Sequence, residues 1–310
     1  MAFVTSTLHT HFDTTDSTNT QLIHTITDGT HPHTAPHLYT ASHQTAGRGQ
    51  HGRTWVSGAD NVFLSLYIPI GNGTYELHAL SGLISLAVGY ELANLPIIQS
   101  INTHRQTASL PPIGVKWAND VGFYDDKAGF FKKLAGILIE PVFKKLDKNT
   151  LVGVVIGVGL NVNNSPVIKD GLYQATCLKE LSDKHSSSFF VRPEPVEGHK
   201  ENRYGSTSSP RTVFSQLTAQ DLYIPMTNAI FQAVEICNHC KEPMYLQNFI
   251  DKFNANHLLT DKLIHIFMQN NMTDIYAKGR CIGIGNQGEL LLNDNGDIKP
   301  IFAGMAKIVN

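Results

Sequence analysis

The sequence lacks any long apolar run, and this absence bounds the class of protein first. A helix that spans a membrane needs about 20 consecutive apolar residues, and no stretch of the 310 residues approaches that length. The first residues, MAFVTSTLHTHFDTTD, have neither a basic start nor a long apolar core, so we expect no signal peptide. We therefore expect a cytoplasmic protein that does not associate with membranes.

Cysteine is also scarce, since the chain has only 4 of them. A secreted disulfide framework would be shorter and richer in cysteine. Cys237 and Cys240 form a CxxC pair with His239 between them, but a zinc site would need a second ligand pair at similar spacing. The prolines of HPHTAPH, residues 31–37, favour a surface loop over a histidine metal site. We expect no metal site in the protein.

An excess of positive charge is missing as well. The chain has 24 Lys and Arg against 26 Asp and Glu, for a formal net charge of −2. A protein that grips nucleic acid through its phosphates needs a basic face. The balance argues against a general electrostatic grip on nucleic acid, but it leaves room for a local basic pocket.

What the sequence does contain is a series of strand-like runs with few helices between them. Alternating or continuous apolar residues predict strands at 37–46, 61–70, 113–120, 133–143 and 151–163. Helical spacing predicts a short helix at 16–29, capped by Ser17 or Thr18, and a longer one at 74–95. Because most strands are separated only by short turns, we expect an α+β fold with an antiparallel-rich sheet.

The composition changes in the second half of the chain. Residues 183–211 are rich in Ser, Pro, Gly and charge, which predicts a disordered insertion without a catalytic role. Two helices are expected around 220–240 and 243–254, followed by short strands with turn signals that predict a small closed barrel. We therefore expect a catalytic domain at 1–258 and a C-terminal domain at 259–310.

A glycine-rich loop, GRGQHGRT at 47–54, matches two nucleotide-binding patterns. Gly47, Gly49 and Gly52 fit the dinucleotide pattern G-x-G-x-x-G, and the loop comes within one residue of the phosphate-binding pattern. Both patterns need a helix after the loop, because the helix N-terminus helps to bind phosphate. Here a strand follows, so neither mechanism applies.

The local chemistry of this loop still favours a ligand. Glycines let a backbone approach a ligand closely. Arg48 and Arg53 supply permanent positive charge, and Trp55 offers a flat apolar face. The loop suits an anionic ligand that carries a purine, although a solvated hairpin turn explains the loop equally well when it is taken alone.

Three further polar clusters stand at the ends of predicted strands. KWAND holds Lys116, Asn119 and Asp120, KLAGILIE holds Lys133 and Gly136, and GVGLNVN holds Asn161. Each has a structural alternative: a Lys–Asp ion pair, a tight turn and a satisfied turn residue. Their occurrence together, in this order, favours a binding site.

These segments resemble the biotin–protein ligase family. The resemblance covers nearly the whole chain outside the Ser/Pro-rich segment, and its motifs are DSTN at 16–19, QTAGRGQHGRTW at 44–55, KWAND at 116–120, KLAGILIE at 133–140 and GVGLNVN at 157–163. It implies an α+β catalytic domain of the class II aminoacyl-tRNA synthetase-like type, with a mixed, largely antiparallel sheet, and a small C-terminal SH3-like β-barrel. It also implies an ATP-dependent ligase that forms biotinyl-5′-AMP from biotin and ATP. The biotin then passes to a lysine of a biotin carboxyl carrier protein, such as that of acetyl-CoA carboxylase.

The resemblance assigns roles to individual residues. Biotin is expected to contact Ser17, Thr18, Asn19, Gln44, Arg48, Gly49, Gln50, Lys133 and Gly136. ATP or the adenylate is expected to contact Arg48, Arg53, Trp55, Lys116, Asn119, Gly136 and Asn161. Arg48 and Lys133 are the expected catalytic cations, because the biotin carboxylate and a phosphate of ATP repel each other. Asp120 is expected to orient or deprotonate the acceptor lysine, and Mg²⁺ is expected to accompany the pyrophosphate.

Some positions depart from the family pattern. Gln50 stands where many members carry Arg, so easier release of the adenylate is expected if that Arg helps to hold it. Ala118 replaces a common Pro. Because DSTN begins at Asp16, no room remains before it for the DNA-binding module of some members, and we expect no repressor function. The sequence leaves open whether the chain is a monomer or a homodimer.

Two other functions compete with this one. A lipoate or octanoate transferase would share the fold, but the arginine- and glycine-rich motif with a following His–Asp, typical of those enzymes, is missing. A non-catalytic sensor of biotinyl-AMP would keep the pocket and lose Lys133 or Arg48, and both residues are present.

Overall fold

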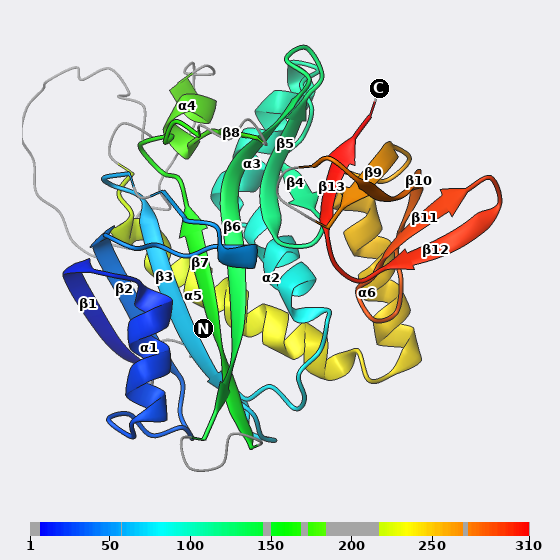
Figure 1. Cartoon of the computed structure of the whole chain (residues 1–310). Coiled ribbons are helices and arrows are strands. Elements are labelled where there is room, and N and C mark those ends of the chain that lie inside the picture. The colour runs from blue at the N-terminus through cyan, green and yellow to red at the C-terminus, as the bar shows by residue number, and fades with distance from the viewer. Residues whose placement is uncertain are drawn as a thin grey trace, which may run out of the picture.

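The computed structural model of the chain describes residues 7–56, 58–144, 150–168, 173–183, 217–268 and 272–309. The predicted insertion at 183–211 lies outside the described residues, apart from residue 183. Within the described part, the chain builds a large mixed sheet, flanking helices and a second, smaller sheet at the C-terminal end (Figure 1).

The large sheet has the strand order β1-β2-β3-β7-β6-β5-β4, with β8 beside β6. Its strands are β1 (Leu8–Thr15), β2 (His37–Gln44), β3 (Val62–Pro69), β4 (Gly114–Lys116), β5 (Asp120–Asp125), β6 (Phe130–Phe143), β7 (Leu151–Leu160) and β8 (Gln174–Ala175). The pairs β1–β2 and β6–β8 are parallel, and the other neighbours are antiparallel. The prediction of a mixed, largely antiparallel sheet is therefore confirmed.

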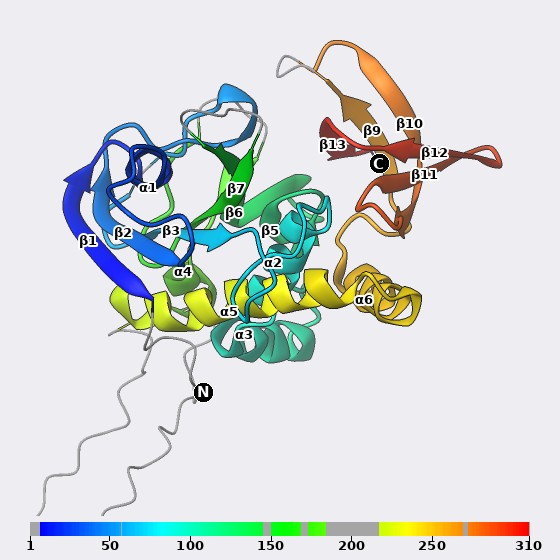
Figure 2. The ribbon, with the colours of Figure 1, turned by 90° about the horizontal axis from the view of Figure 1, so that it is seen from below.

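Alternation along β3 and β7 gives the sheet two different faces. Leu64 and Leu66 on β3, with Ile156 and Val158 on β7, point into the main apolar core. That core also contains buried residues of α2 (Ile84–Ala93) and α5 (Gln220–His239), which cover this face. The helix α1 (Thr18–Thr27) packs on the opposite face, as Figure 2 shows. The face beside α1 is the one that remains for a ligand.

Helix α1 forms where the sequence predicts it. Ser17 has extended backbone dihedrals, and its hydroxyl accepts a hydrogen bond from the Thr20 N–H, which is the N-cap arrangement. Leu22 and Ile26, one turn apart, are buried against the sheet. The cap therefore fixes the DSTN segment at the edge of the sheet face that lies beside α1.

The predicted helix at 74–95 is wrong over its first half. The helix α2 begins only at Ile84, and Leu80, in the first half of the predicted range, is 48% exposed. Ser81 and Gly82 come just before the helix. A Cβ on Gly82 would lie 2.3 Å from the carbonyl oxygen of Gln287. Residue 82 therefore serves a close backbone contact with the C-terminal sheet and not a helix. The strands β1, β5 and β8, and the helices α3 (Pro96–Thr107) and α4 (Leu178–Asp183), were not predicted, and the predicted strand at 113–120 is wrong beyond β4, where a turn at 117–119 leads into β5.

The C-terminal sheet is antiparallel, with the order β12-β11-β10-β9-β13. Its strands are β9 (Leu263–Phe267), β10 (Ile275–Ile284), β11 (Leu290–Asp294), β12 (Asp297–Ile301) and β13 (Met305–Ile308), and α6 (Pro243–Asn256) precedes them. The proposed domain boundary at 258/259 falls between α6 and β9. The indole N–H of Trp117 donates to the Gly288 carbonyl at 2.9 Å, so the β10–β11 turn is tied directly to the KWAND segment.

No single helix in the described ranges is long and apolar enough to span a membrane. Only α2 and α3 taken together reach the required length and composition, and they are bent by 64°.

His257, a buried histidine beside the proposed domain boundary at 258/259, predicts a pH effect on stability. Burial, helped by the charge of Lys116, lowers the pKa of His257 from 6.5 to about 3. Above pH 6.5 the His257 ring is neutral in both the folded and the unfolded chain. Below pH 6.5 the ring binds a proton in the unfolded chain but stays neutral in the folded chain. The free energy of unfolding should therefore decrease as the pH is lowered below 6.5, by about 1.4 kcal/mol per pH unit for this group.

Measurement of unfolding free energy by urea titration between pH 7 and pH 5 checks this effect. His257→Gln should lose about 2 kcal/mol less than the parent protein between pH 6.5 and pH 5. His33→Gln, at an exposed position, is the matched control and should follow the parent protein. An unchanged pH dependence in His257→Gln would show that His257 is protonated in the fold.

Candidate active site

A cavity of about 450 Å³ lies on the sheet face beside α1, under the glycine loop. Every residue predicted to bind biotin lines it: Ser17, Thr18, Asn19, Gln44, Arg48, Gly49, Gln50, Lys133 and Gly136. Arg53, Trp55 and Asn119 from the predicted nucleotide set line it too. The structure thus brings together residues from α1, the loop, β6 and the segment before β5.

Three predicted site residues lie elsewhere. Lys116 and Asp120 line a neighbouring cavity of about 340 Å³, which shares Arg53 and Asn119 with the first. Asn161 lines neither cavity. Its amide donates to the Thr176 carbonyl at 3.0 Å, as expected for a satisfied structural residue.

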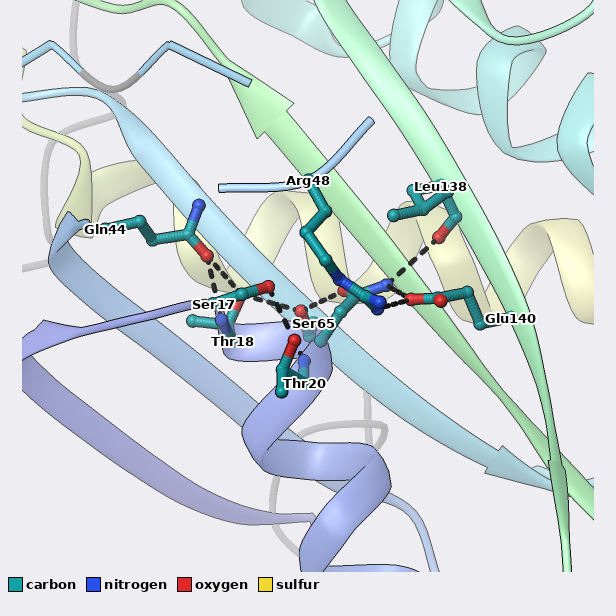
Figure 3. Close-up of polar contacts among 9 residues, drawn as sticks. Ser17, Thr18, Thr20, Gln44, Arg48, Ser65, Leu138 and Glu140 are labelled. Carbon is teal, nitrogen blue, oxygen red and sulfur yellow. Dashed lines mark hydrogen bonds and ion pairs between the residues drawn. The ribbon is translucent and has the colours of Figure 1, made fainter. Parts of the chain in front are cut away.

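The wall of the cavity beside α1 is a connected set of polar side chains (Figure 3). The Gln44 Oε1 accepts from the backbone N–H of Thr18 at 2.8 Å and from its hydroxyl at 3.2 Å. The buried Ser65 hydroxyl on β3 lies 2.7 Å from the Thr18 hydroxyl oxygen and also contacts Asn19 Oδ1. Such a wall is held rigid by its own hydrogen bonds and can recognise a compact polar ring.

A β-bulge in β6 aims Lys133 into the cavity. Val121 pairs with Ala135 and Gly122 pairs with Lys133, so Leu134 is an extra residue in β6. Without the bulge, alternation would place Lys133 and Gly136 on opposite faces of the sheet. With it they share the cavity face, and a Cβ on Gly136 would lie 3.1 Å from Lys133 Nζ.

Lys133 is already paired with a carboxylate of the protein. Its Nζ lies 2.6 Å from Asp120 Oδ1, and the two side chains are only 8% and 12% exposed. Burial alone would raise the pKa of Asp120, but the charges of Lys133 and Lys116 hold it below its ordinary value. Asp120 is therefore a poor store for a proton and a good hydrogen-bond acceptor for a cation.

Trp55 rests on a pair of glycines. Gly136 of β6 and Gly159 of β7 are directly paired across the two strands. A Cβ would lie 2.8 Å from the indole at Gly136 and 2.4 Å from it at Gly159, so only glycine leaves room for the ring. The Trp55 ring also lies 5.3 Å from Lys133 Nζ. The indole is thereby held beside the cationic centre of the cavity.

The sequence interpretation missed several residues of this site. Glu140, Gly157 and Gly159 were parts of its motifs without a role, and Ser65 was not singled out. A signal existed for two of them. The β7 sequence LVGVVIGVGL carries Gly157 and Gly159 two residues apart, on the face that packs beside α1. Gly157 makes room for Asn19, whose Oδ1 would lie 2.1 Å from a Cβ there.

Among the described residues, no group of three or more His, Cys, Asp or Glu is arranged to hold a metal ion. Cys237 lies buried in α5, and Cys240 is the C-cap of that helix. Burial raises the pKa of both thiols, which does not favour thiolate chemistry.

Comparison with known sequences finds similarity to proteins named as ligases. A sequence model described as the biotin/lipoate A/B protein ligase family matches residues 11–161. The chain is 27% identical over 267 residues to the bifunctional ligase/repressor BirA of Salmonella typhimurium, covering 85% of this chain and 64% of the relative. It is 37% identical over 144 residues to the biotin–[acetyl-CoA-carboxylase] ligase of Mycobacterium tuberculosis, covering 46% of this chain and 44% of the relative. The chain thus spans less than two thirds of the length of these curated relatives.

Comparison with solved structures shows the fold. The biotin protein ligase from Aquifex aeolicus, solved with biotin and ATP, superposes with a TM-score of 0.61 at 18% identity, covering 96% of this chain and 97% of that chain. A second structure of the Aquifex aeolicus ligase, without ligands, gives 0.59 at 16% identity, covering 98% and 100%. The expected fold class, a mixed-sheet α+β unit followed by a small antiparallel β unit, is confirmed.

Proposed function

We propose that this chain, whose residues 11–161 match the biotin/lipoate A/B protein ligase family, is an ATP-dependent biotin–protein ligase. One observation carries the proposal: Arg48 and Lys133, from separate segments, line a single cavity together with Trp55. Two cations beside an aromatic ring suit a reaction between two anions, one of which carries a purine. The names of the relatives, which are biotin ligases, support biotin as the acid.

In the first step, an oxygen of the biotin carboxylate attacks the α-phosphorus of ATP. The bond from that phosphorus to pyrophosphate breaks, and biotinyl-5′-AMP forms. Lys133 would leave its pairing with Asp120 in part and donate to the reacting oxygens, whose charge is spread in the transition state. Mg²⁺ would take its ligands mainly from phosphate oxygens and water, since the described residues offer no cluster of three ligands.

In the second step, the neutral amine of an acceptor lysine attacks the acyl carbon, the bond from that carbon to the AMP oxygen breaks, and the amine proton passes to solvent. Asp120 lines the neighbouring cavity and contacts Lys133, so it lies between the two spaces. Because its pKa is lowered, we assign it the role of orienting the incoming amine and not of removing its proton. Lys116, beside it, would repel a protonated amine and favour the neutral form.

A direct experiment separates this function from that of a lipoate ligase. The purified chain is incubated with ATP, a carrier domain and either biotin or lipoate, and AMP release and carrier mass are followed by mass spectrometry. Biotin should give AMP and a biotinylated carrier. Labelling by lipoate and not by biotin would overturn the proposal.

The identity of the partner is a further part of the proposal. The Mycobacterium tuberculosis relative is named for acetyl-CoA carboxylase, which favours the biotin carboxyl carrier domain of such a carboxylase as acceptor. We keep the expectations of a cytoplasmic location and of no specific DNA binding, and a gel shift with duplex DNA tests the second. Sedimentation with and without biotin and ATP decides between monomer and homodimer.

Because residue 50 is Gln and not Arg, we expect the enzyme to hold the adenylate weakly. Its side chain is on the glycine loop and lines both cavities, where many members carry Arg. Gln50→Arg would add a charged donor, and a charge-assisted hydrogen bond contributes about 1.5–3 kcal/mol. Release of biotinyl-5′-AMP should therefore slow by about tenfold or more, as measured by filter retention after removal of free ligand.

The control for this change is Gln106→Arg, at an exposed position of α3. It adds the same charge far from the loop and should leave the release rate unchanged. Equal release rates for the parent protein and Gln50→Arg would rule out a role of residue 50 in holding the adenylate.

A further inference from the structure

We propose that Glu140 is a positioning residue that latches the glycine loop onto β6 by holding Arg48 over the cavity. This inference rests on the proposed function for its effect on catalysis, but the latch itself is a property of the ligand-free protein. Glu140 closes the KLAGILIE motif, and nothing in that motif alone explains a carboxylate at this position.

One carboxylate oxygen of Glu140 receives two donors from distant parts of the chain. Its Oε2 accepts from Asn19 Nδ2 of α1 at 2.9 Å and forms an ion pair with Arg48 Nη2, 92 residues away in sequence (Figure 3). The carboxylate thus joins α1, the loop and β6 at one atom. If it is lost, both the cavity wall and the loop lose a contact.

Three of the four hydrogen-bonding positions of the Asn19 amide are used in this arrangement. Its Nδ2 donates to Glu140 and, more weakly, to the Leu138 carbonyl, while its Oδ1 is contacted by the Ser65 hydroxyl. An amide with these partners has little left to offer a ligand. Asn19 therefore acts by fixing Glu140, which in turn fixes Arg48.

The loop is fastened to the sheet by side chains at its two ends, and both reach β6. Within the loop, Trp55 N–H donates to the Gly47 carbonyl and Gly49 N–H to the Arg53 carbonyl. These bonds close the loop on itself and do not hold it to the sheet. Trp55 rests on Gly136 at one end, and Arg48 pairs with Glu140 at the other. Removal of the second attachment frees the end that carries the catalytic arginine.

The pair is placed to orient and not to stabilise the fold. Arg48 and Glu140 side chains are 40% and 25% exposed, and ion pairs at such positions contribute little to global stability. Only one guanidinium nitrogen of Arg48 is used by Glu140, which leaves the other donors of the fork for a ligand. Glu140 can therefore stay paired while Arg48 contacts the substrate.

The experiment is a double-mutant cycle of Glu140→Ala and Arg48→Ala with three measurements. The first is amide hydrogen exchange of residues 47–55 in the ligand-free protein. The other two are the KM for biotin and the lifetime of enzyme-bound biotinyl-5′-AMP. Glu140→Ala should speed exchange across the loop, raise KM about tenfold and shorten the adenylate lifetime about tenfold, while kcat changes less. In the Arg48→Ala background, the same change should add less than about twofold.

Two further variants separate positioning from simple damage. Glu140→Gln keeps an oxygen for Asn19 and loses the charge opposite Arg48, so it should retain the melting temperature and show most of the loop effect. Asp126→Ala removes an exposed carboxylate from the β5–β6 turn and should change none of the readouts. Effects of Glu140→Ala that add fully to those of Arg48→Ala would overturn the latch, as would unchanged loop exchange.

The outcomes for the latch and for the proposed function are distinguishable. If the parent protein forms no adenylate, the proposed function fails, while loop exchange in the ligand-free variants still decides whether Glu140 holds the loop. If the parent protein is active and loop exchange does not respond to Glu140→Ala, the latch alone fails.

Discussion

Lys133→Ala should lower the rate of biotinyl-5′-AMP formation by on the order of 10²- to 10³-fold, the usual cost of removing one preorganised transition-state donor. Lys133 is the cation that lies deepest in the cavity, with its side chain 8% exposed, so solvent cannot replace its charge. Its loss also leaves two anions to meet without compensation. The effect should fall on kcat of pyrophosphate release and less on the KM for ATP.

The variant needs a companion because Lys133 also neutralises a buried carboxylate. Removal of one partner of a buried pair costs about 3–5 kcal/mol of stability, and Asp120 would keep only the influence of Lys116 and Arg53. Lys133→Gln can still donate to Asp120, so it should melt nearer to the parent protein and yet remain inactive. Near-normal pyrophosphate release by the folded Gln variant would refute the catalytic role of Lys133.

Gly159→Ala should weaken ATP binding by more than tenfold. The added methyl would lie 2.4 Å from the Trp55 ring, and the strand pair below it cannot move because Val158 and Leu160 on either side are buried in the core. The indole must therefore leave its seat, and overpacking of this kind typically costs about 1–3 kcal/mol. A titration with ATP in the presence of biotin, following Trp fluorescence and AMP formation together, measures the change.

The cause of this effect can be isolated by removing the ring. In a Trp55→Ala background there is no indole to collide with, so Gly159→Ala should add little to the loss of affinity already present. If the losses of ATP affinity from the two changes add fully, Gly159 is required by the β7 strand and not by the packing of the Trp55 ring.

The local parts of this structure follow well from the sequence. Alternation in β3 and β7, and the N-cap at Ser17 before Leu22 and Ile26, are contained within single segments. The prediction that a strand and not a helix follows the glycine loop is also confirmed. After the 3-10 turn at Gln50–Gly52 the chain enters β3 and not a helix.

The parts that the sequence could not supply depend on contacts between distant segments. The length of α2 was overestimated because Gly82 meets Gln287, a contact that no local pattern contains. Glu140 had no role until its oxygen was seen to meet Arg48 and Asn19.

The bulge in β6 and the environment of Asn161 also depend on contacts between distant segments. The bulge at Leu134 reverses which residues of β6 face the cavity, and it becomes visible only when β6 is paired with β5. Asn161 was placed on the nucleotide side by resemblance, whereas its amide is used by the Thr176 carbonyl. Pairing between strands therefore decides which residues of a motif face the cavity.

The central claim is that Arg48 and Lys133 bring a carboxylate and an α-phosphate together so that one oxygen bridges them. Biotin labelled with ¹⁸O in its carboxylate tests this directly, with a carrier domain as acceptor and the mass of the released AMP as readout. The account predicts that AMP gains one labelled oxygen, because that oxygen stays on phosphorus when the acyl carbon is transferred. Biotinylated carrier accompanied by AMP without label would contradict it.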